Sequence, residues 1–424
     1  MHPGWLRVRS DRALDLRRPN RSAGTAKMTE LAVVGGVYYE RCEWPEWNMI
    51  FGSGGRAATA VTSLIDKVRL WSYASDDAAP QFSTTATLYG FEFSSTKIPR
   101  TLSFDYIHPL SIPTLRPPFG TIPQGAPILV NGETVLRFGM LEGTAVVRAK
   151  TCVYDPQSAF APEHFHANGS VAERLAIVAN SDEVRSLSGI ADPLVAAQEL
   201  LLRSKAEVVV VKSGLEGALV MTSGRYEVIP AYQTKSSFTI GSGDVFAAAF
   251  AAFWGVHGCD PIAASRLSSL AVADYVEDRS LPIRPADALA SNGRKALKPS
   301  RDRIYLAGPF FTMAQRWLID EARRCLTEAG LKVFSPFHEI GPGPAEEIAP
   351  ADIAAIVECQ SMFAILDGLD SGTVYEVGYA RALGKPVVGF SQIVSEEDLK
   401  MIEGSGCMIF SDFATAILAA AARP

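Results

Sequence analysis

The chain has 424 residues and a formal net charge of −6, with 48% apolar and 20% charged residues. A chain of this length exceeds what one hydrophobic core supports, so we expect more than one domain. The acidic balance excludes a general electrostatic basis for binding nucleic acid or an anionic membrane. No apolar stretch has the length of a membrane helix, and the six cysteines contain no CxxC pair that would indicate a zinc site. These features predict a cytoplasmic protein that acts on small molecules.

The order of sequence patterns along the chain predicts two domains. Residues 1–27 are basic and lack the apolar core of a secretory signal, so we expect a disordered tail or an extension upstream of a true start at Met28. From Leu31 onward, short apolar runs alternate with helical patterns, which is typical of a parallel α/β sheet. The proline-containing, basic segment 291–301 is interpreted as a linker. The predicted domains are therefore residues 28–290 and 302–424.

A turn rich in glycine precedes a helix in the N-terminal domain, in the run Thr239–Asp244. Phosphoryl transfer to a hydroxyl needs backbone donors for the phosphate and a base for the hydroxyl proton. We expect Gly241, Ser242 and Gly243 to form an anion hole at the helix start, with Asp244 as the base. Because glycine turns before helices are common, this run alone is a weak signal.

The run Thr239–Asp244 resembles the signature of the PfkB carbohydrate-kinase family, which has a ribokinase-like, three-layer α/β fold. Further matches follow in the family's order, at Gly54, Gly55, Asp155, Asn180, Glu183, Lys212, Gly214 and Gly217.

The PfkB resemblance implies ATP and Mg²⁺ as cofactors. It implies that Asn180 and Glu183 organise magnesium and phosphate, with Glu183 acting on the metal directly or through water. It places the nucleotide at residues 212–217, which include Lys212, Gly214 and Gly217. It also places the acceptor substrate beside the diglycine 54–55.

The acceptor side of this domain departs from the family pattern. The family usually carries an aspartate just after its first strand, and here the nearest acid is Glu40. The segment between Gly36 and Gly52 is short, so we expect a reduced lid. Two interpretations stay open: an active phosphotransferase from ATP to an alcohol group, or a nucleotide-binding relative without catalysis.

For the C-terminal domain, the order of strand and helix patterns predicts a small doubly wound parallel sheet of the flavodoxin or Rossmann type. The expected strands include Arg303–Ala307, Lys332–Ser335 and Met362–Leu366, with a helix over Met313–Ala329 between the first two. In such sheets, ligands bind beyond the carboxyl ends of the strands. Gly308 and the acidic turn 367–370 would emerge there.

Acidic residues beside that edge suit the cleavage of an N-glycosidic bond, which needs a carboxylate at the sugar. Glu376 is the candidate nucleophile. We place it at the start of a helix, where the helix dipole favours the ionised carboxylate. Asp370, in the preceding turn, is a candidate acceptor for a sugar hydroxyl.

Residues 302–410 resemble the nucleoside 2-deoxyribosyltransferase family through IYLAGPFF, DIAAI and LDGLDSGTVYEVGYARALGKPV. The resemblance implies that Glu376 is the nucleophile, that Tyr305 orients it and that Asp352 faces the base. It also implies that Gly308 and Asp370 bind substrate. Nucleoside-monophosphate N-hydrolases of this family usually carry serine at the position of Asp370, so its carboxylate favours a free 5′-hydroxyl.

The two resemblances together predict a bifunctional enzyme of nucleotide salvage, in which a nucleoside is cleaved or its deoxyribosyl group transferred, and a sugar is phosphorylated. The alternative order is a nucleoside kinase followed by hydrolysis of the monophosphate. A further alternative makes the kinase-like domain a non-catalytic regulator of the glycosidase. The expected partners are nucleosides or sugars, without nucleic acid or membrane, and the resemblance implies a homo-oligomer. The base and the pentose are left open.

Overall fold

The computed structural model describes residues 6–7, 28–158 and 161–423. Most of the predicted tail therefore lies outside the described residues. The chain divides into two compact units. The N-terminal unit comprises Met1–Ile107, Ser111–Thr234 and Thr239–Ala296, and the C-terminal unit comprises His108–Leu110, Lys235–Phe238 and Leu297–Pro424. Within the described residues, no helix has the length and apolar character needed to cross a membrane.

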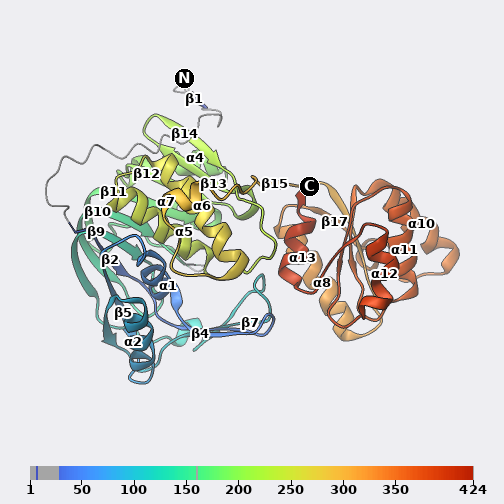
Figure 1. The fold of residues 1–424 in the computed structure, drawn as a ribbon, viewed down its shortest axis with the longest axis horizontal. Helices are drawn as coiled ribbons and strands as arrows, with labels where there is room; N and C mark the ends of the chain where they lie inside the picture. The colour runs from blue at the N-terminus through green and yellow to red at the C-terminus, as the bar shows by residue number, and fades with distance from the viewer. Residues whose placement is uncertain (1–5, 8–27, 159–160, 424) are drawn as a thin grey trace. The chain divides into compact units, whose positions relative to one another are not determined.

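The N-terminal unit is built on a ten-stranded sheet (Figure 1). All neighbouring strands are parallel except the pairs β12–β13 and β13–β14. In spatial order the strands are β1 (Leu6–Arg7), β14 (Arg225–Ile229), β13 (Ala218–Thr222), β12 (Val208–Lys212), β11 (Val171–Asn180), β10 (Ala145–Asp155), β9 (Ile128–Phe138), β2 (Glu30–Val34), β5 (Lys67–Ala74) and β6 (Glu92–Lys97).

Helices cover both faces of this sheet, which gives three layers. Strand β2 shows how, because alternate side chains of a strand point to opposite faces. Leu31 and Val33 pack in the core beneath one helical layer, whereas Ala32 and Val34 pack in the core on the other face. The first layer contains α1 (Gly52–Val61), α2 (Ala78–Tyr89), α5 (Ser242–Phe250), the π-helix η3 (Ala251–Val256), α6 (Pro261–Asp278) and α7 (Ala286–Ala290). The second contains α3 (Ser181–Ser188) and α4 (Pro193–Arg203).

Three consecutive strands of the sheet depart from the expected alternation. Strands β9, β10 and β11 follow one another with no intervening helix in the described residues, although they pair in parallel. In the second half of each strand, both faces are nevertheless buried in the two cores. Short helices of the 3₁₀ type occur elsewhere in the unit, at η1 (Phe119–Thr121) and η2 (Gly214–Glu216).

A small four-stranded sheet occupies the place of the predicted lid. Its strands have three or four residues each, in the order β4 (Trp47–Ile50), β3 (Tyr39–Cys42), β7 (Ser103–Tyr106) and β8 (Thr114–Arg116). Glu40 and Cys42 of β3 are buried, whereas Arg41 between them is exposed. One face of the lid sheet therefore packs inward and carries a carboxylate.

The C-terminal unit has a five-stranded parallel sheet in the order β17 (Lys332–Phe334), β16 (Arg303–Ala307), β18 (Ser361–Ile365), β19 (Val387–Phe390) and β20 (Met408–Phe410). One face is covered by α10 (Ala345–Glu358), α11 (Ser371–Ala382) and α12 (Glu396–Gly404), and the other by α8 (Met313–Glu328) and α13 (Phe413–Ala420) (Figure 1). The one-turn helix α9 (Pro336–Glu339) follows β17, and β15 (Lys298–Pro299) pairs with β21 (Ala422–Arg423).

This strand order, 2-1-3-4-5 by position in the unit, confirms the doubly wound prediction. The order reverses between β16 and β18, and ligands of such folds bind outside the carboxyl ends of the strands at that point. Tyr305 lies on β16, and the loop after β18 leads into α11. The fold therefore brings the predicted residues to the expected edge.

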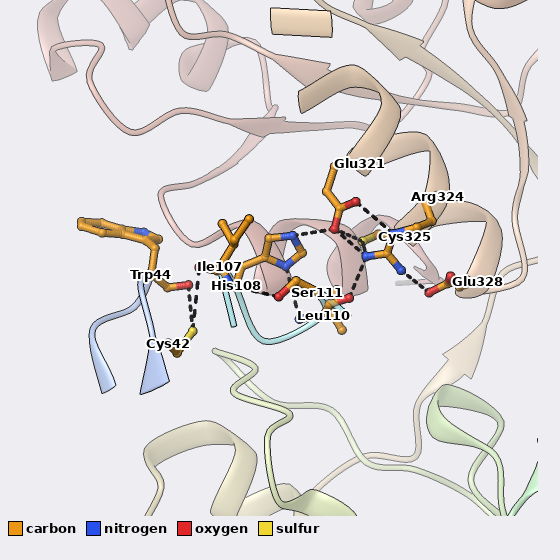
Figure 2. A network of polar contacts seen from close by, with 10 residues as sticks. All are labelled: Cys42, Trp44, Ile107, His108, Leu110, Ser111, Glu321, Arg324, Cys325 and Glu328. Atoms are coloured by element: carbon orange, nitrogen blue, oxygen red, sulfur yellow. Dashed lines mark hydrogen bonds and ion pairs between the residues drawn. The ribbon is translucent and has the colours of Figure 1, made fainter. Parts of the chain in front are cut away.

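The C-terminal unit also includes the three-residue segment His108–Leu110, which contacts α8 (Figure 2). The Nε2 atom of His108 lies 2.9 Å from Oε1 of Glu321, and Arg324 donates to Leu110 O at 2.8 Å. His108, Glu321 and Cys325 have the composition of a metal site, with ligand atoms within 4.8 Å of one another. Arg324 already neutralises Glu321 at 2.5 Å, however, so this cluster is an ion-pair network.

Candidate active site

The candidate site of the C-terminal unit has Glu376 at its centre. Tyr305, which is fully buried on β16, donates a hydrogen bond of 2.7 Å from its hydroxyl to Oε1 of Glu376. Burial, followed by the charge of Glu376, raises the pKa of Tyr305, so the phenol keeps its proton and acts only as a donor. This hydrogen bond holds the glutamate in a fixed orientation.

Burial controls the ionisation of Glu376. It raises the pKa from an ordinary 4.5 to about 7, assisted by the charges of Asp352 and Asp370 and opposed by the Tyr305 hydrogen bond. The expectation that the helix start would favour the ionised form was wrong. Glu376 lies in the second turn of α11, which begins at Ser371, and the influence of the helix terminus falls off within the first turn. The glutamate is thus held near the midpoint of its titration at neutral pH.

Asp352 on α10 is the second carboxyl group of the site. Its Oδ1 atom is buried and has no hydrogen-bond partner in the described residues. Burial raises its pKa above the ordinary value. Its buried oxygen can accept a hydrogen bond from a ligand.

Asp370 has a structural role at the start of α11. Its side chain caps α11, because Oδ2 accepts hydrogen bonds from the Thr373 amide at 2.9 Å and from the Thr373 hydroxyl at 3.0 Å. N-capping alone accounts for an aspartate at this position. Gly308 is likewise explained by packing, since a Cβ there would lie 2.8 Å from Ile319 and 3.1 Å from Ile365.

Asp367, the first acid of the turn 367–370, has a role that the sequence did not reveal. Its carboxylate accepts hydrogen bonds from the amides of Gln392 and Ile393 and from the hydroxyl of Ser391. These contacts tie the loop after β18 to the loop after β19. In the sequence, Asp367 is visible only as an acidic residue after a strand. Its hydrogen-bond partners lie more than twenty residues further along the chain, so the sequence does not indicate them.

The candidate site of the N-terminal unit lies where α5 begins. Gly241 has a φ of 81°, a conformation that glycine adopts without strain, and it is the N-cap of α5. A Cβ on Gly243 would lie 3.4 Å from Nζ of Lys212. The ammonium group therefore lies beside the glycine turn, which combines a cation with the amides of a helix N-terminus.

Lys212 is surrounded by acids. It forms an ion pair of 2.5 Å with Asp155. Burial disfavours its charge, but the carboxylates of Asp155, Glu183 and Asp244 together raise its pKa, so the lysine stays charged. The other oxygen of Asp155, Oδ1, is buried without a hydrogen-bond partner in the described residues. A cation and an orphaned carboxylate oxygen suit the phosphates and metal of magnesium-bound ATP.

Asn180 and Glu183 form a reciprocal capping box on α3. The Asn180 side chain accepts from the Glu183 amide at 2.9 Å, and the Glu183 carboxylate accepts from the Asn180 amide at 2.8 Å. The same glutamate accepts a bond of 3.1 Å from the Ser158 amide. This pair thus has a local structural reason for its spacing. Magnesium binding by Glu183 stays a prediction.

The other predicted glycines also have packing reasons. A Cβ on Gly54 would lie 2.7 Å from the backbone of Gly35, and one on Gly55 would lie 2.7 Å from the ring of Phe82. At Gly217 a Cβ would lie 1.9 Å from Ile229 O, whereas Gly214 has open space around it. Close approach of backbone segments therefore explains Gly54, Gly55 and Gly217 before any ligand is considered.

Asp244 is held at both carboxylate oxygens. Arg56 donates to Oδ2 at 2.8 Å, and Gln157 donates to Oδ1 at 2.6 Å. Arg56 also forms an ion pair with Glu40 and donates to the Tyr275 hydroxyl at 2.9 Å. Only 1% of Arg56 is exposed, so this arginine neutralises two buried carboxylates.

Sequence reasoning missed both donors to Asp244. Arg56 directly follows the diglycine 54–55 in the otherwise small and apolar helix α1. A charged residue at such a position was the available signal. Gln157 gave no comparable signal, because its contact joins segments 87 residues apart.

Comparisons with known proteins agree with this division. Residues 148–269 match the model of the pfkB family carbohydrate kinases, and residues 304–410 match the model of the nucleoside 2-deoxyribosyltransferases. The chain thus joins a PfkB-family domain to a nucleoside 2-deoxyribosyltransferase-family domain. The sheet topology and the first match together identify the fold of the N-terminal unit as ribokinase-like.

Solved structures similar to the chain include several kinases. A ribokinase from Thermotoga maritima is 18% identical, covers 62% of this chain and 100% of its own, and has a TM-score of 0.47. A pyrophosphate-dependent kinase of the ribokinase family, bound to a pyrophosphate analogue and myo-inositol, is 16% identical over 61% and 98% of the chains, with a TM-score of 0.46. A fructokinase variant from Vibrio cholerae O395 is also 16% identical, over 60% and 94%, with a TM-score of 0.46. Among curated protein sequences there is no match.

Replacing Glu376 by glutamine should stabilise the C-terminal unit at alkaline pH. Because the folded state raises this pKa from 4.5 to about 7, the buried carboxylate costs stability above pH 7 and nothing below about pH 4.5. Relative to the original chain, the free energy of unfolding of the variant should be higher by up to about 3 kcal/mol at pH 8, compared with no such difference at pH 4.5. Hydrogen exchange of the β18 amides measures it. The exposed Glu347→Gln change is the control, and an equal gain in both variants would contradict this account.

Replacing Arg56 by methionine should destabilise the N-terminal unit by roughly 3–5 kcal/mol, because it leaves the Glu40 and Asp244 carboxylates buried without their cation. The double variant Arg56→Met, Glu40→Gln should recover part of that loss. The free energy of unfolding is measured by urea denaturation, and hydrogen exchange of the β2 amides reports the stability of the N-terminal unit. A single variant as stable as the original chain would show that the arginine does not neutralise these acids.

Proposed function

We propose that the C-terminal unit cleaves the N-glycosidic bond of a nucleoside, with Glu376 as the nucleophile. The observation that carries this proposal is the 2.7 Å hydrogen bond from Tyr305 to Glu376, together with the buried Oδ1 atom of Asp352. Two carboxyl groups in different environments suit a reaction that needs one nucleophile and one acid. The match of residues 304–410 to the nucleoside 2-deoxyribosyltransferase model supports the same chemistry.

The proposed reaction proceeds by double displacement. Ionised Glu376 attacks the anomeric carbon, an ester bond forms between its carboxylate and the sugar, and the bond to the base nitrogen breaks. In this step Asp352 enters protonated and Glu376 ionised, and Asp352 gives its proton to the departing base. A second base or water then takes the sugar from Glu376, which gives deoxyribosyl transfer or hydrolysis.

The N-terminal unit is proposed to phosphorylate a sugar. Lys212 and the glycine turn at Gly241–Gly243 would hold the phosphates of ATP, and Asp155 with Glu183 would hold magnesium. Bound magnesium ATP supplies the phosphoryl group. The chain's own residues orient the acceptor, and Asp244 takes the hydroxyl proton once one of its two donors moves away.

In the order that we favour, cleavage releases a sugar that the N-terminal unit then phosphorylates. The carboxylate of Asp370 supports this order, because it would repel a 5′-phosphate. The occupied carboxylate of Asp244 supports a different role, in which the N-terminal unit binds nucleotide and regulates the glycosidase. A nucleoside kinase followed by monophosphate hydrolysis is the third arrangement.

Product analysis separates these arrangements. The full chain is incubated with nucleosides, deoxynucleosides and their monophosphates, with and without magnesium ATP, and products are identified by mass spectrometry. We expect free base from unphosphorylated nucleosides, abolished in Glu376→Ala, and a sugar phosphate that depends on ATP and Asp244. Base released only from monophosphates would reverse the order. An effect of ATP on cleavage without any phosphorylated product, unchanged in Asp244→Ala, would indicate regulation.

The pH dependence of cleavage should report Glu376. Activity should rise as the pH increases through about 7, because the ionised carboxylate is the nucleophile. Tyr305→Phe removes the hydrogen bond that favours ionisation, so the rise should move to higher pH by about one unit. The measurement is a pH profile of kcat/KM for both proteins. A profile that loses amplitude without moving would mean that the tyrosine does not act through the glutamate's ionisation.

A further inference from the structure

A cavity of about 520 Å³ lies in the N-terminal unit at the ends of β9 and β10. Its size falls in the range of small-molecule sites. Most of its wall is apolar or neutral, and it includes Phe138, Met140, Tyr154 and Gln157. One strong cation, Arg137, also lines it.

Arg137 is buried and has no acidic partner among the residues that the structure describes. Only 2% of the residue is exposed, and its guanidinium lies 4.7 Å from the ring centre of Tyr154 and 5.6 Å from that of Phe165. Its hydrogen-bond partners are all neutral. They are Phe165 O at 3.1 Å, the Ser170 hydroxyl at 3.1 Å, the Asn168 side-chain oxygen at 3.4 Å and the Thr144 hydroxyl at 3.5 Å.

The guanidinium therefore retains capacity for an anion. Its Nε atom is buried and has no hydrogen-bond partner in the part of the chain that the structure describes. Glu163 also lines the cavity, yet its carboxylate makes no ion pair with Arg137 among those residues. Burying a cation without a counter-charge is unfavourable, and an anionic ligand would offset that cost.

Gln157 connects this cavity to Asp244. It lines the cavity, and its side-chain amide donates the 2.6 Å hydrogen bond to Oδ1 of Asp244. Its backbone has a φ of 40°, in the left-handed region that a residue with a side chain rarely adopts. A ligand hydroxyl that replaces the Gln157 amide would therefore reach the proposed catalytic base from the cavity.

We infer that this cavity binds a small anionic polyol, such as a sugar phosphate or a sugar acid. Its anion pairs with Arg137, and one of its hydroxyl groups takes the place of the Gln157 amide on Asp244. Only the use of that hydroxyl as an acceptor rests on the proposed phosphotransferase, and it would make an anionic polyol, rather than the neutral sugar released by cleavage, the acceptor. The binding itself is independent of both proposed reactions.

Calorimetric titration of the full chain, without ATP, tests the inference. The probes are ribose 5-phosphate, gluconate, inorganic phosphate and neutral ribose. Arg137→Gln should weaken the two anionic polyols roughly tenfold to a hundredfold and leave ribose unchanged. Arg185→Gln, which removes an exposed arginine on α3, is the control and should change nothing. Equal affinities in the Arg137→Gln variant and the original chain would overturn the inference.

Hydrogen exchange on the unaltered chain keeps the test decisive if Arg137→Gln does not fold. Ribose 5-phosphate should protect amides of residues 137–144 and 154–158. Protection confined to other segments, or no binding of any anionic probe, would overturn the inference. Phosphate binding as tightly as the anionic polyols would refute the part that places a hydroxyl at Gln157. Base release by the C-terminal unit is measured separately, so its failure leaves this result unaffected.

Discussion

Burial of carboxylates governs both candidate sites of this chain. In the C-terminal unit, Glu376 lies where removal from water disfavours its charge, and the Tyr305 hydroxyl opposes that effect with one hydrogen bond. The balance leaves the glutamate near half ionisation at neutral pH. A glutamate that is poorly solvated and fixed in orientation has the two features that the proposed attack on an anomeric carbon requires.

The N-terminal unit meets the same constraint with cations. Asp155 pairs with Lys212, whereas Glu40 and Asp244 share Arg56. Removing either cation would leave buried acids unpaired, so the polar interior depends on these two residues. Arg137 reverses the pattern, because it is a buried cation whose hydrogen-bond partners in the described part of the chain are all neutral. That contrast is why we assign it an anionic ligand.

The sequence predicted the fold well where the signals were local. The expected strand at Arg303–Ala307 was confirmed within the doubly wound sheet. Periodicity suffices for such a feature, because it depends on neighbours in the chain. The contact between Tyr305 and Glu376 joins residues 71 apart, and it was expected from the family resemblance rather than from a local pattern.

Other features depend on contacts between distant segments and were not predictable in the same way. The pairing of Gln157 with Asp244 and the sharing of Arg56 between two acids arise only after folding. The sequence predicted strands alternating with helices, whereas β9, β10 and β11 follow one another with no helix between them in the described residues. The pKa of Glu376 was misjudged because its helix position was visible in the sequence, whereas its burial was not.

A covalent sugar on Glu376 is the most direct consequence of the proposed chemistry. The full chain is mixed with a deoxynucleoside, quenched in acid within the first turnover and digested, and the peptides are weighed by mass spectrometry. We predict an added sugar on the peptide that carries Glu376, absent in the Glu376→Gln variant. Base release with the sugar attached to another carboxylate, or base release that persists in that variant, would contradict the account.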